Sequence, residues 1–129
     1  MRFVRFCLVG AAGFLLDAAV LYWLIAVTPL GPLPARALSY LAAATGTWLL
    51  NRRYTFANAR RSGALHREWL HYLAVNAVGG GINYLAYALL VLSVEAVASQ
   101  PVLGVAVGSA CALLFNYLAN KRWVFRVAS

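Results

Sequence analysis

The stretch Asn51-Arg52-Arg53-Tyr54-Thr55-Phe56 decides the fold, because a second copy, Asn120-Lys121-Arg122-Trp123-Val124-Phe125, follows at an offset of 69 residues. Each copy ends a long apolar segment with an amide, two cations and two aromatic residues. This order of groups is typical of a membrane-spanning helix that reaches the lipid headgroups. The repeated ending predicts a chain built from two similar membrane-spanning halves.

The composition indicates a membrane protein. The chain has 129 residues, of which 64% are hydrophobic and 11% are charged, and its formal net charge is +8. Soluble domains carry about 25% charged residues. The cations lie at the ends of apolar runs, which favours an anionic inner leaflet over nucleic acid as their partner. We therefore expect an all-α membrane protein that has no nucleic-acid partner.

Four apolar segments predict four transmembrane helices. We expect the first at about residues 6–27, the second at 35–54 and the third at 69–94. The fourth begins at Pro101, after a connection over residues 95–100, and ends in the second copy of the motif. Pro34 directly precedes the second predicted helix, and Pro101 begins the fourth. Both positions suit proline, because the first turn of a helix tolerates it.

Small and polar residues recur at every fourth position of the second and fourth predicted helices. Such faces allow helices to approach closely in lipid. The two ladders are Ala35, Ser39, Ala43, Thr47 and Asn51, and Gly104, Gly108, Ala112, Asn116 and Asn120.

The first and third predicted helices match each other at an offset of 66 residues. This offset pairs Phe6 with Tyr72, Gly13 with Gly79, and Asp17 with Asn83. We therefore expect one domain over residues 1–129, with repeat one at 3–56, a cytoplasmic loop at 57–66 and repeat two at 67–125. Two spans per repeat predict parallel repeats, related by an axis along the membrane normal.

The distribution of cations predicts the orientation. Lys and Arg are enriched on the cytoplasmic side of membrane proteins. Only Arg36 falls at the other side of the predicted bundle, so both termini and the central loop should be cytoplasmic. The cations of the predicted cytoplasmic side are Arg2, Arg5, Arg52, Arg53, Arg60, Arg61, Arg67, Lys121, Arg122 and Arg126.

These residues resemble the GtrA family of small four-span membrane proteins over about residues 3–125. The resemblance is carried by Arg5-Phe6 and Val9-Gly10 at the start of the first helix, by Asp17 within it, and by the two motif copies. It implies a multi-pass protein of the bacterial cytoplasmic (inner) membrane that acts in cell-surface polysaccharide synthesis. Members are thought to move polyprenyl-phosphate-linked monosaccharides to the outer leaflet, and others have been considered membrane partners of glycosyltransferases.

The cation pairs of the two motifs are candidate phosphate ligands. Arginine binds phosphate bidentately through charge-assisted hydrogen bonds, and lysine binds it as a point charge. The alternative is that these cations only set the topology. The candidates are Arg52, Arg53, Lys121 and Arg122. The motif aromatics Tyr54, Phe56, Trp123 and Phe125 are interpreted as an interfacial belt.

Polar residues within the helices are candidates for a sugar pathway. Asp17 lies midway along the first helix, where a carboxylate is costly and should face the bundle. It could serve a sugar or a proton, or it could hydrogen-bond Asn83, Asn116 or Thr47. The asparagines could bind sugar hydroxyls or join helices. The pathway candidates are Asp17, Asn51, Asn76, Asn83, Asn116 and Asn120.

Three functions fit the sequence. The leading hypothesis is a flippase for a polyprenyl-phosphate sugar lipid. The first alternative is a non-transporting membrane anchor of a glycosyltransferase, and a weaker one is a small proton-coupled multidrug transporter. No nucleophile–base pair or metal-ligand spacing is visible, so we expect neither an enzyme nor a cofactor. Four helices make a thin bundle, which predicts a homodimer or a glycosyltransferase partner.

Overall fold

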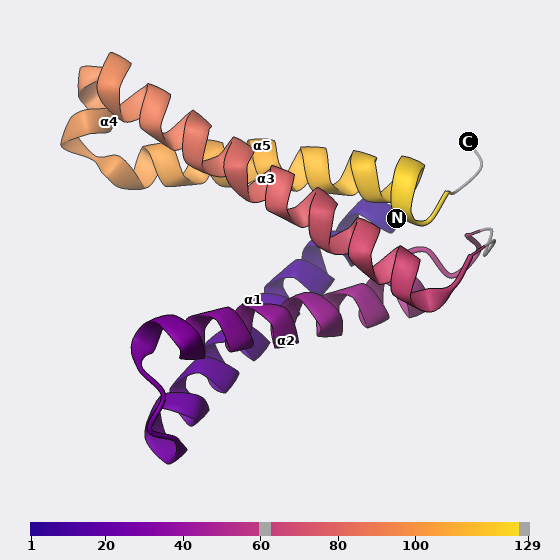
Figure 1. Cartoon of the computed structure of the whole chain (residues 1–129). Helices are drawn as coiled ribbons and strands as arrows, with labels where there is room; N and C mark the ends of the chain where they lie inside the picture. The colour runs from indigo at the N-terminus through magenta and orange to yellow at the C-terminus, as the bar shows by residue number, and fades with distance from the viewer. Residues whose placement is uncertain (60–62, 127–129) are drawn as a thin grey trace. The chain divides into compact units, whose positions relative to one another are not determined.

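The computed structural model describes residues 1–59 and 63–126, and over these ranges it is helical and contains no strand. The all-α prediction is therefore confirmed. Contacts divide the chain into two compact units, Met1–Ala59 (unit 1) and Arg60–Ser129 (unit 2). Each unit contains a pair of long helices that fold back on each other (Figure 1). Arg60 and Arg61 of the predicted loop lie outside the described residues.

Unit 1 consists of α1 (Arg2–Val27), α2 (Pro32–Leu50) and a short π-helix, η1 (Asn51–Thr55). The extended backbone of Thr28 ends α1, and the Thr28 hydroxyl donates to the Leu24 carbonyl. The second helix begins three residues before the expected start at Ala35. Pro32 opens it because proline has a fixed φ and lacks the N–H that would be unsatisfied at this position.

Unit 2 consists of α3 (Leu65–Ser93), α4 (Glu95–Ser99), α5 (Pro101–Ala119) and a second π-helix, η2 (Asn120–Val124). The long helix α3 begins four residues before the expected start at Trp69, because a polar turn precedes the apolar segment. The segment over residues 95–100 was expected only to connect two spans. Most of it instead forms α4, and the Val97 side chain of this helix is buried.

Glycine and small polar residues let α1 and α2 pack closely in unit 1. A Cβ atom on Gly13 would collide with the Thr47 side chain, and one on Gly46 would lie 2.7 Å from Leu16 Cδ2. Gly10, which the sequence places on the same face as Gly13, has nothing within 4 Å of that position. Of the two α1 glycines on this face, therefore, Gly13 is in close contact with α2 and Gly10 is not.

The same arrangement joins α3 and α5 in unit 2. A Cβ atom on Gly79 would collide with the Asn116 side chain, and one on Gly108 would lie 2.6 Å from the Asn83 backbone oxygen. Gly80 and Gly81 have nothing within 4 Å of the corresponding positions, and α3 remains helical through all three glycines. Only Gly79 of this triplet is needed for close packing.

The packing role of the two small-residue ladders is confirmed. In each ladder four of the five residues are buried, and the exceptions, Thr47 and Asn116, are half-buried against a glycine of the neighbouring helix. The buried members are Ala35, Ser39, Ala43 and Asn51 in unit 1, and Gly104, Gly108, Ala112 and Asn120 in unit 2.

Three helical segments among the described residues are long and apolar enough to cross a membrane. They are Arg2–Val27, Leu65–Ser93 and Pro101–Val124, with mean hydropathies of 2.0, 1.5 and 1.9. The second predicted span, α2, is not among them; it carries Arg36 and several hydroxyl side chains in 19 residues. Large apolar side chains are exposed on all three, including Phe14 at 72% and Leu92 at 85%. Such surfaces suit contact with lipid.

Candidate functional site

Both copies of the repeated motif fold as a π-helical turn. The Phe56 N–H donates to the Asn51 carbonyl, and the Phe125 N–H donates to the Asn120 carbonyl, each over 2.8 Å. These bonds join residues five apart, whereas the bonds of an α-helix join residues four apart. Single π-helical turns are rare and occur frequently at functional sites. The motif therefore forms the same unusual local structure in both units.

In unit 1 the π-turn is held together by buried groups. Asn51 is 1% exposed, and its Oδ1 accepts a 2.8 Å hydrogen bond from the Thr55 hydroxyl. Phe56 is also 1% exposed, and its ring packs edge-on against Phe6 with centroids 6.3 Å apart. The first and last residues of the motif thus anchor the turn to α1 and α2.

Unit 2 repeats this anchoring with one difference. The Phe125 ring packs edge-on against Tyr72 at 6.2 Å, and Asn120 Nδ2 donates to the Asn116 carbonyl over 2.7 Å. Val124 replaces the threonine of unit 1 and supplies no hydroxyl. Asn120 Oδ1 is buried and has no hydrogen-bond partner within the described parts of the chain. Unit 2 therefore contains an unsatisfied acceptor where unit 1 contains a hydrogen bond.

The four predicted phosphate ligands occupy consecutive positions of the two turns. Arg52 and Lys121 are half-buried, while Arg53 and Arg122 are exposed. The Arg53 guanidinium lies 5.8 Å from the centre of the Tyr54 ring. Each turn therefore presents one exposed cation and holds a second one partly against the helices.

The interfacial-belt interpretation is wrong for half of the motif aromatics. Tyr54 and Trp123 are 53% and 56% exposed, as a residue at the lipid interface would be. Phe56 and Phe125 are almost completely buried within their own units. The π-turn accounts for this difference, because it brings the last aromatic residue of each motif back onto the first helix of the unit.

Asp17 has a partner that the sequence did not suggest. Its Oδ2 forms an ion pair with the Arg36 guanidinium, which reaches it from the first turns of α2. The Asp17 side chain is 16% exposed, and its Oδ1 is buried without a hydrogen-bond partner in the described ranges. Within unit 1, the partner of Asp17 is therefore Arg36 and not Thr47, which was one of the alternatives that the sequence left open.

The asparagines within the helices of unit 2 lie in three different settings. Asn76 Nδ2 donates to the Tyr72 carbonyl of its own helix over 2.8 Å. Asn116 packs against Gly79, and its Oδ1 is buried without a partner among residues 1–59 and 63–126. Asn83 packs against Gly108 and also lines an open pocket of about 240 Å³. The other residues that line this pocket are Gly80, Tyr84, Tyr87 and Val105.

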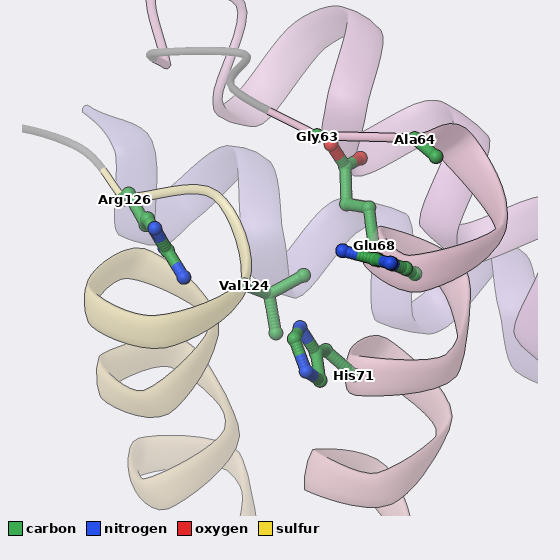
Figure 2. Close-up of a pocket in the computed structure, with 7 residues that line it drawn as sticks. Gly63, Ala64, Glu68, His71, Val124 and Arg126 are labelled. Carbon is green, nitrogen blue, oxygen red and sulfur yellow. The ribbon is translucent and has the colours of Figure 1, made fainter.

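A second pocket in unit 2 contains charged residues that the sequence reasoning did not select. Its volume is about 270 Å³, and it lies between the start of α3 and the end of η2 (Figure 2). Neither Lys121 nor Arg122 lines it. Two features of the sequence could have indicated this pocket: the polar residues at the start of α3 and the arginine just after the second motif. The lining residues are Gly63, Ala64, Arg67, Glu68, His71, Val124 and Arg126.

No group of three or more His, Cys, Asp or Glu side chains in the described ranges could hold a metal ion.

Known proteins place this chain in a family. It matches the model of the GtrA/DPMS transmembrane domain over residues 5–125. It is 31% identical over 123 residues to the uncharacterized membrane protein YngA of Bacillus subtilis (strain 168), and the alignment covers 94% of this chain and 77% of YngA. The chain belongs to the GtrA/DPMS transmembrane-domain family, generally non-catalytic membrane proteins linked to the processing of lipid-linked sugars.

Proposed function

We propose that this protein moves a polyprenyl-phosphate-linked monosaccharide from the cytoplasmic to the outer leaflet of the bacterial inner membrane. The observation that carries the proposal is the cation-bearing π-turn at the end of the second long helix in each unit. A phosphate at a headgroup layer needs cations at that depth, and the sugar needs polar groups partway across the bilayer. The family supports the link to lipid-linked sugars.

The proposed topology has four spans, with both termini and the central loop in the cytoplasm. Helix α2 and the following π-turn η1 together form the second of these spans, because the turn continues the helix without a break. The two units then act as parallel repeats that each enter and leave the membrane once. Identical edge-on ring contacts and identical π-turns in the two units support this design.

Arg52, Arg53, Lys121 and Arg122 hold the lipid phosphate in this proposal. The exposed guanidiniums of Arg53 and Arg122 provide planar, bidentate donors, and the half-buried cations add positive charge beside them. Asn51 and Asn120 act through the turns that they anchor, because both amides are buried. Phosphate binding therefore depends on the shape of the turn as well as on its charge.

Asp17 and Asn83 provide polar groups for the sugar during the crossing. Both lie past the middle of long helices, Asp17 in the 26-residue α1 and Asn83 in the 29-residue α3, at matching positions of the two units. Arg36 binds one oxygen of Asp17, and the second oxygen can accept a hydrogen bond from a hydroxyl. The amide of Asn83 and the neighbouring Tyr84 and Tyr87 line an open pocket. These groups replace hydrogen bonds to water that a sugar loses in the bilayer.

The test is a translocation assay in proteoliposomes with a polyprenyl phosphoglucose as the probe. Arg53→Ala and Arg122→Ala should each weaken binding of the probe by about 1.5–3 kcal/mol, the contribution of one hydrogen bond to a charged group. Asp17→Ala should slow its appearance in the outer leaflet and leave phosphate binding nearly unchanged. Arg2→Gln, which removes a cation outside the proposed site, serves as the control.

Two outcomes would change the proposal. If all three variants bind and translocate like the parent, the assigned residues are wrong. If the parent moves no lipid-linked sugar but retains a glycosyltransferase at the membrane, the protein is an anchor. In that case the exposed apolar faces of its helices would contact the enzyme, and a homodimer would not be required.

A further inference from the structure

We propose that Arg36 is the outer-leaflet binding site for the phosphate of the transported lipid, and that Asp17 holds its guanidinium in position. This inference rests on the proposed function and adds a second phosphate site to it. The motif cations bind the phosphate at the cytoplasmic headgroup layer, and Arg36 receives the same group on the other side of the membrane.

The sequence places Arg36 apart from every other cation of the chain. Of the eleven Lys and Arg residues, ten lie in the motifs, near the termini or around the central loop. Arg36 instead lies in the first turns of α2, close to the connection from α1. In the proposed topology this connection is on the outer side. Cations are enriched on the cytoplasmic side, so a cation at the outer end does not serve to set the topology.

Exposed aromatic residues indicate the depth of the outer headgroup layer. Tyr22 and Trp23, near the end of α1, are 73% and 61% exposed. Such residues concentrate where a membrane meets water. Asp17 precedes Tyr22 by five residues, which is about 7.5 Å along the helix. The guanidinium that pairs with Asp17 therefore lies near enough to this layer to meet a lipid phosphate.

Most hydrogen-bond donors of the Arg36 guanidinium remain available. Its Nη1 contacts Asp17 Oδ2, and its side chain has no other partner among residues 1–59 and 63–126. A guanidinium has five N–H groups, and the Arg36 side chain is 54% exposed in spite of the ion pair. The Nε and Nη2 groups form the opposite edge of the fork. They can donate two parallel bonds to one phosphate, as arginine does in bidentate sites.

Asp17 positions the guanidinium and also weakens the site. The Asp17 side chain is only 16% exposed, so the helices hold the carboxylate that Arg36 reaches. The ion pair stays intact when a phosphate binds, because the phosphate uses other N–H groups. A carboxylate on the same guanidinium repels the phosphate, however, and lowers the affinity. Low affinity suits a site that releases its ligand into the outer leaflet.

The backbone of α2 contributes little to this site. The N-terminus of a helix can bind an anion through its free N–H groups. Pro32 and Pro34 lack this group, and the Ala35 N–H donates to the Gly31 carbonyl over 3.1 Å. Binding should therefore depend on the Arg36 side chain, which substitution can remove.

The matching positions of unit 2 carry no charge. Val105 matches Arg36 at an offset of 69 residues, and Asn83 matches Asp17 at an offset of 66. Both line an open pocket whose lining residues include no cation. Each unit has a cation-bearing motif, whereas the outer site belongs to unit 1 alone.

The test measures binding of farnesyl phosphate to the full chain in nanodiscs of zwitterionic lipid, where both faces of the membrane are open. The background is Arg53→Ala/Arg122→Ala, so that the motif arginines do not mask a weaker site. Adding Asp17→Asn/Arg36→Val should weaken binding by roughly tenfold or more, as expected for one lost charged hydrogen bond. Adding Arg2→Gln instead should leave the affinity unchanged. Thermal unfolding of each variant reports whether it is folded.

Asp17→Asn alone, in the same background, gives a prediction of opposite sign. The amide oxygen still accepts a hydrogen bond from Arg36, but the negative charge beside the phosphate is gone. Binding of farnesyl phosphate should become about fivefold tighter, since like charges about 4 Å apart in water repel each other by about 1 kcal/mol. A purely structural ion pair would produce no such gain.

Inorganic phosphate distinguishes a lipid headgroup from a free anion. The part of the binding that depends on Arg36 should be at least tenfold weaker for inorganic phosphate than for farnesyl phosphate. Equal affinities of this site for the two probes would overturn the lipid assignment.

The inference fails if the folded variant with Asp17→Asn/Arg36→Val binds farnesyl phosphate like its background, or if Asp17→Asn alone does not bind it more tightly. A parent that translocates the lipid would in that case keep the proposed function and lose only the outer site. Binding that depends on Arg36, in a parent that translocates no lipid, would keep the site and remove the flippase function.

Discussion

The two units are alike where each motif folds and different within the helices, at the positions of Asp17 and Arg36. Phe6 packs on Phe56 with ring planes at 64°, and Tyr72 packs on Phe125 at the same angle. Both motifs end in a π-turn. At mid-helix, unit 1 has the Asp17–Arg36 ion pair. The scaffold is therefore shared, whereas the polar chemistry inside it is particular to each unit.

Unit 2 has neutral residues at the positions of the ion pair. Asn83 matches Asp17 and Val105 matches Arg36 by sequence offset, and both line an open pocket. In unit 1 the guanidinium reaches over this region and neutralises the carboxylate. The comparison shows that helix packing does not require a charge pair at this depth. Exchanges between the units can therefore measure what the pair contributes to unit 1.

The largest effect is expected from Arg36→Val, which leaves the Asp17 carboxylate without its partner. We expect a loss of about 3 kcal/mol of stability, near the lower end for breaking a buried pair, because Arg36 is 54% exposed and partly screened. The double variant Asp17→Asn/Arg36→Val reproduces the residues of unit 2 and should regain most of this loss. Unfolding in detergent micelles measures the stability of the single and the double variant. A double variant as unstable as the single one would show that the charge pair is not the cause.

The next largest effect is expected from Gly108→Ala, at the position that matches Ser39 of unit 1. A Cβ atom on Gly108 would lie 2.6 Å from the Asn83 backbone oxygen, and a backbone atom cannot move aside easily. Gly108→Ala should therefore destabilise unit 2 by about 1–3 kcal/mol, the usual cost of overpacking. Gly81→Ala is the matched control, since open space surrounds that position. Equal thermal stability of the two variants would contradict the packing described here.

Smaller effects are expected from exchanging the residues at the end of each π-turn, Thr55 and Val124. Thr55→Val should cost about 1–2 kcal/mol, because it leaves the buried Asn51 Oδ1 without the hydroxyl that donates to it. The reverse exchange, Val124→Thr, should stabilise unit 2 by about 1 kcal/mol, since it offers a donor to Asn120 Oδ1. Chemical unfolding of both variants tests the pair. Destabilisation by Val124→Thr would mean that the two turns are built differently.

The smallest effect is expected from Arg5→His, which gives unit 1 the residue found at the matching position of unit 2, His71. The variant loses the exposed hydrogen bond from the Arg5 guanidinium to the Tyr54 carbonyl. We expect a cost of about 0.5–1 kcal/mol, the lower part of the range for one hydrogen bond. Arg2→Gln, which removes a cation one turn earlier, is the control for charge alone. A melting temperature that falls equally in both variants would assign the effect to charge and not to the bond.

The sequence predicts the parts of the fold that follow from periodicity. The helices, the buried ladders and the match between the two motifs were all visible as spacings, and the structure confirms the helices and the ladders. The π-turns were not visible, because no residue preference separates a π-turn from the end of an α-helix. This is why Phe56 and Phe125 were expected at the lipid interface when they are buried.

The missed features of the site depend on contacts between segments. Arg36 reaches Asp17 only because α1 and α2 are antiparallel and the arginine side chain is long. The pocket of unit 2 combines the start of α3 with a residue after η2, more than 50 positions later in the chain. Neither juxtaposition leaves a local pattern in the sequence. The cations and the mid-helix polar residues could be selected from the sequence, but their partners could not.

The π-turn also sets the direction in which the last residue of the motif points. Successive residues of an α-helix advance by 100° around the helix axis, because one turn contains 3.6 residues. The π-turn holds one residue more than an α-turn between Asn51 and Phe56. An unbroken α-helix of the same length would turn Phe56 by about 100° away from Phe6. Removing one residue from the first motif would instead let the turn relax to the α-helical repeat, with the Phe56 ring still one turn after Asn51 and directed toward Phe6.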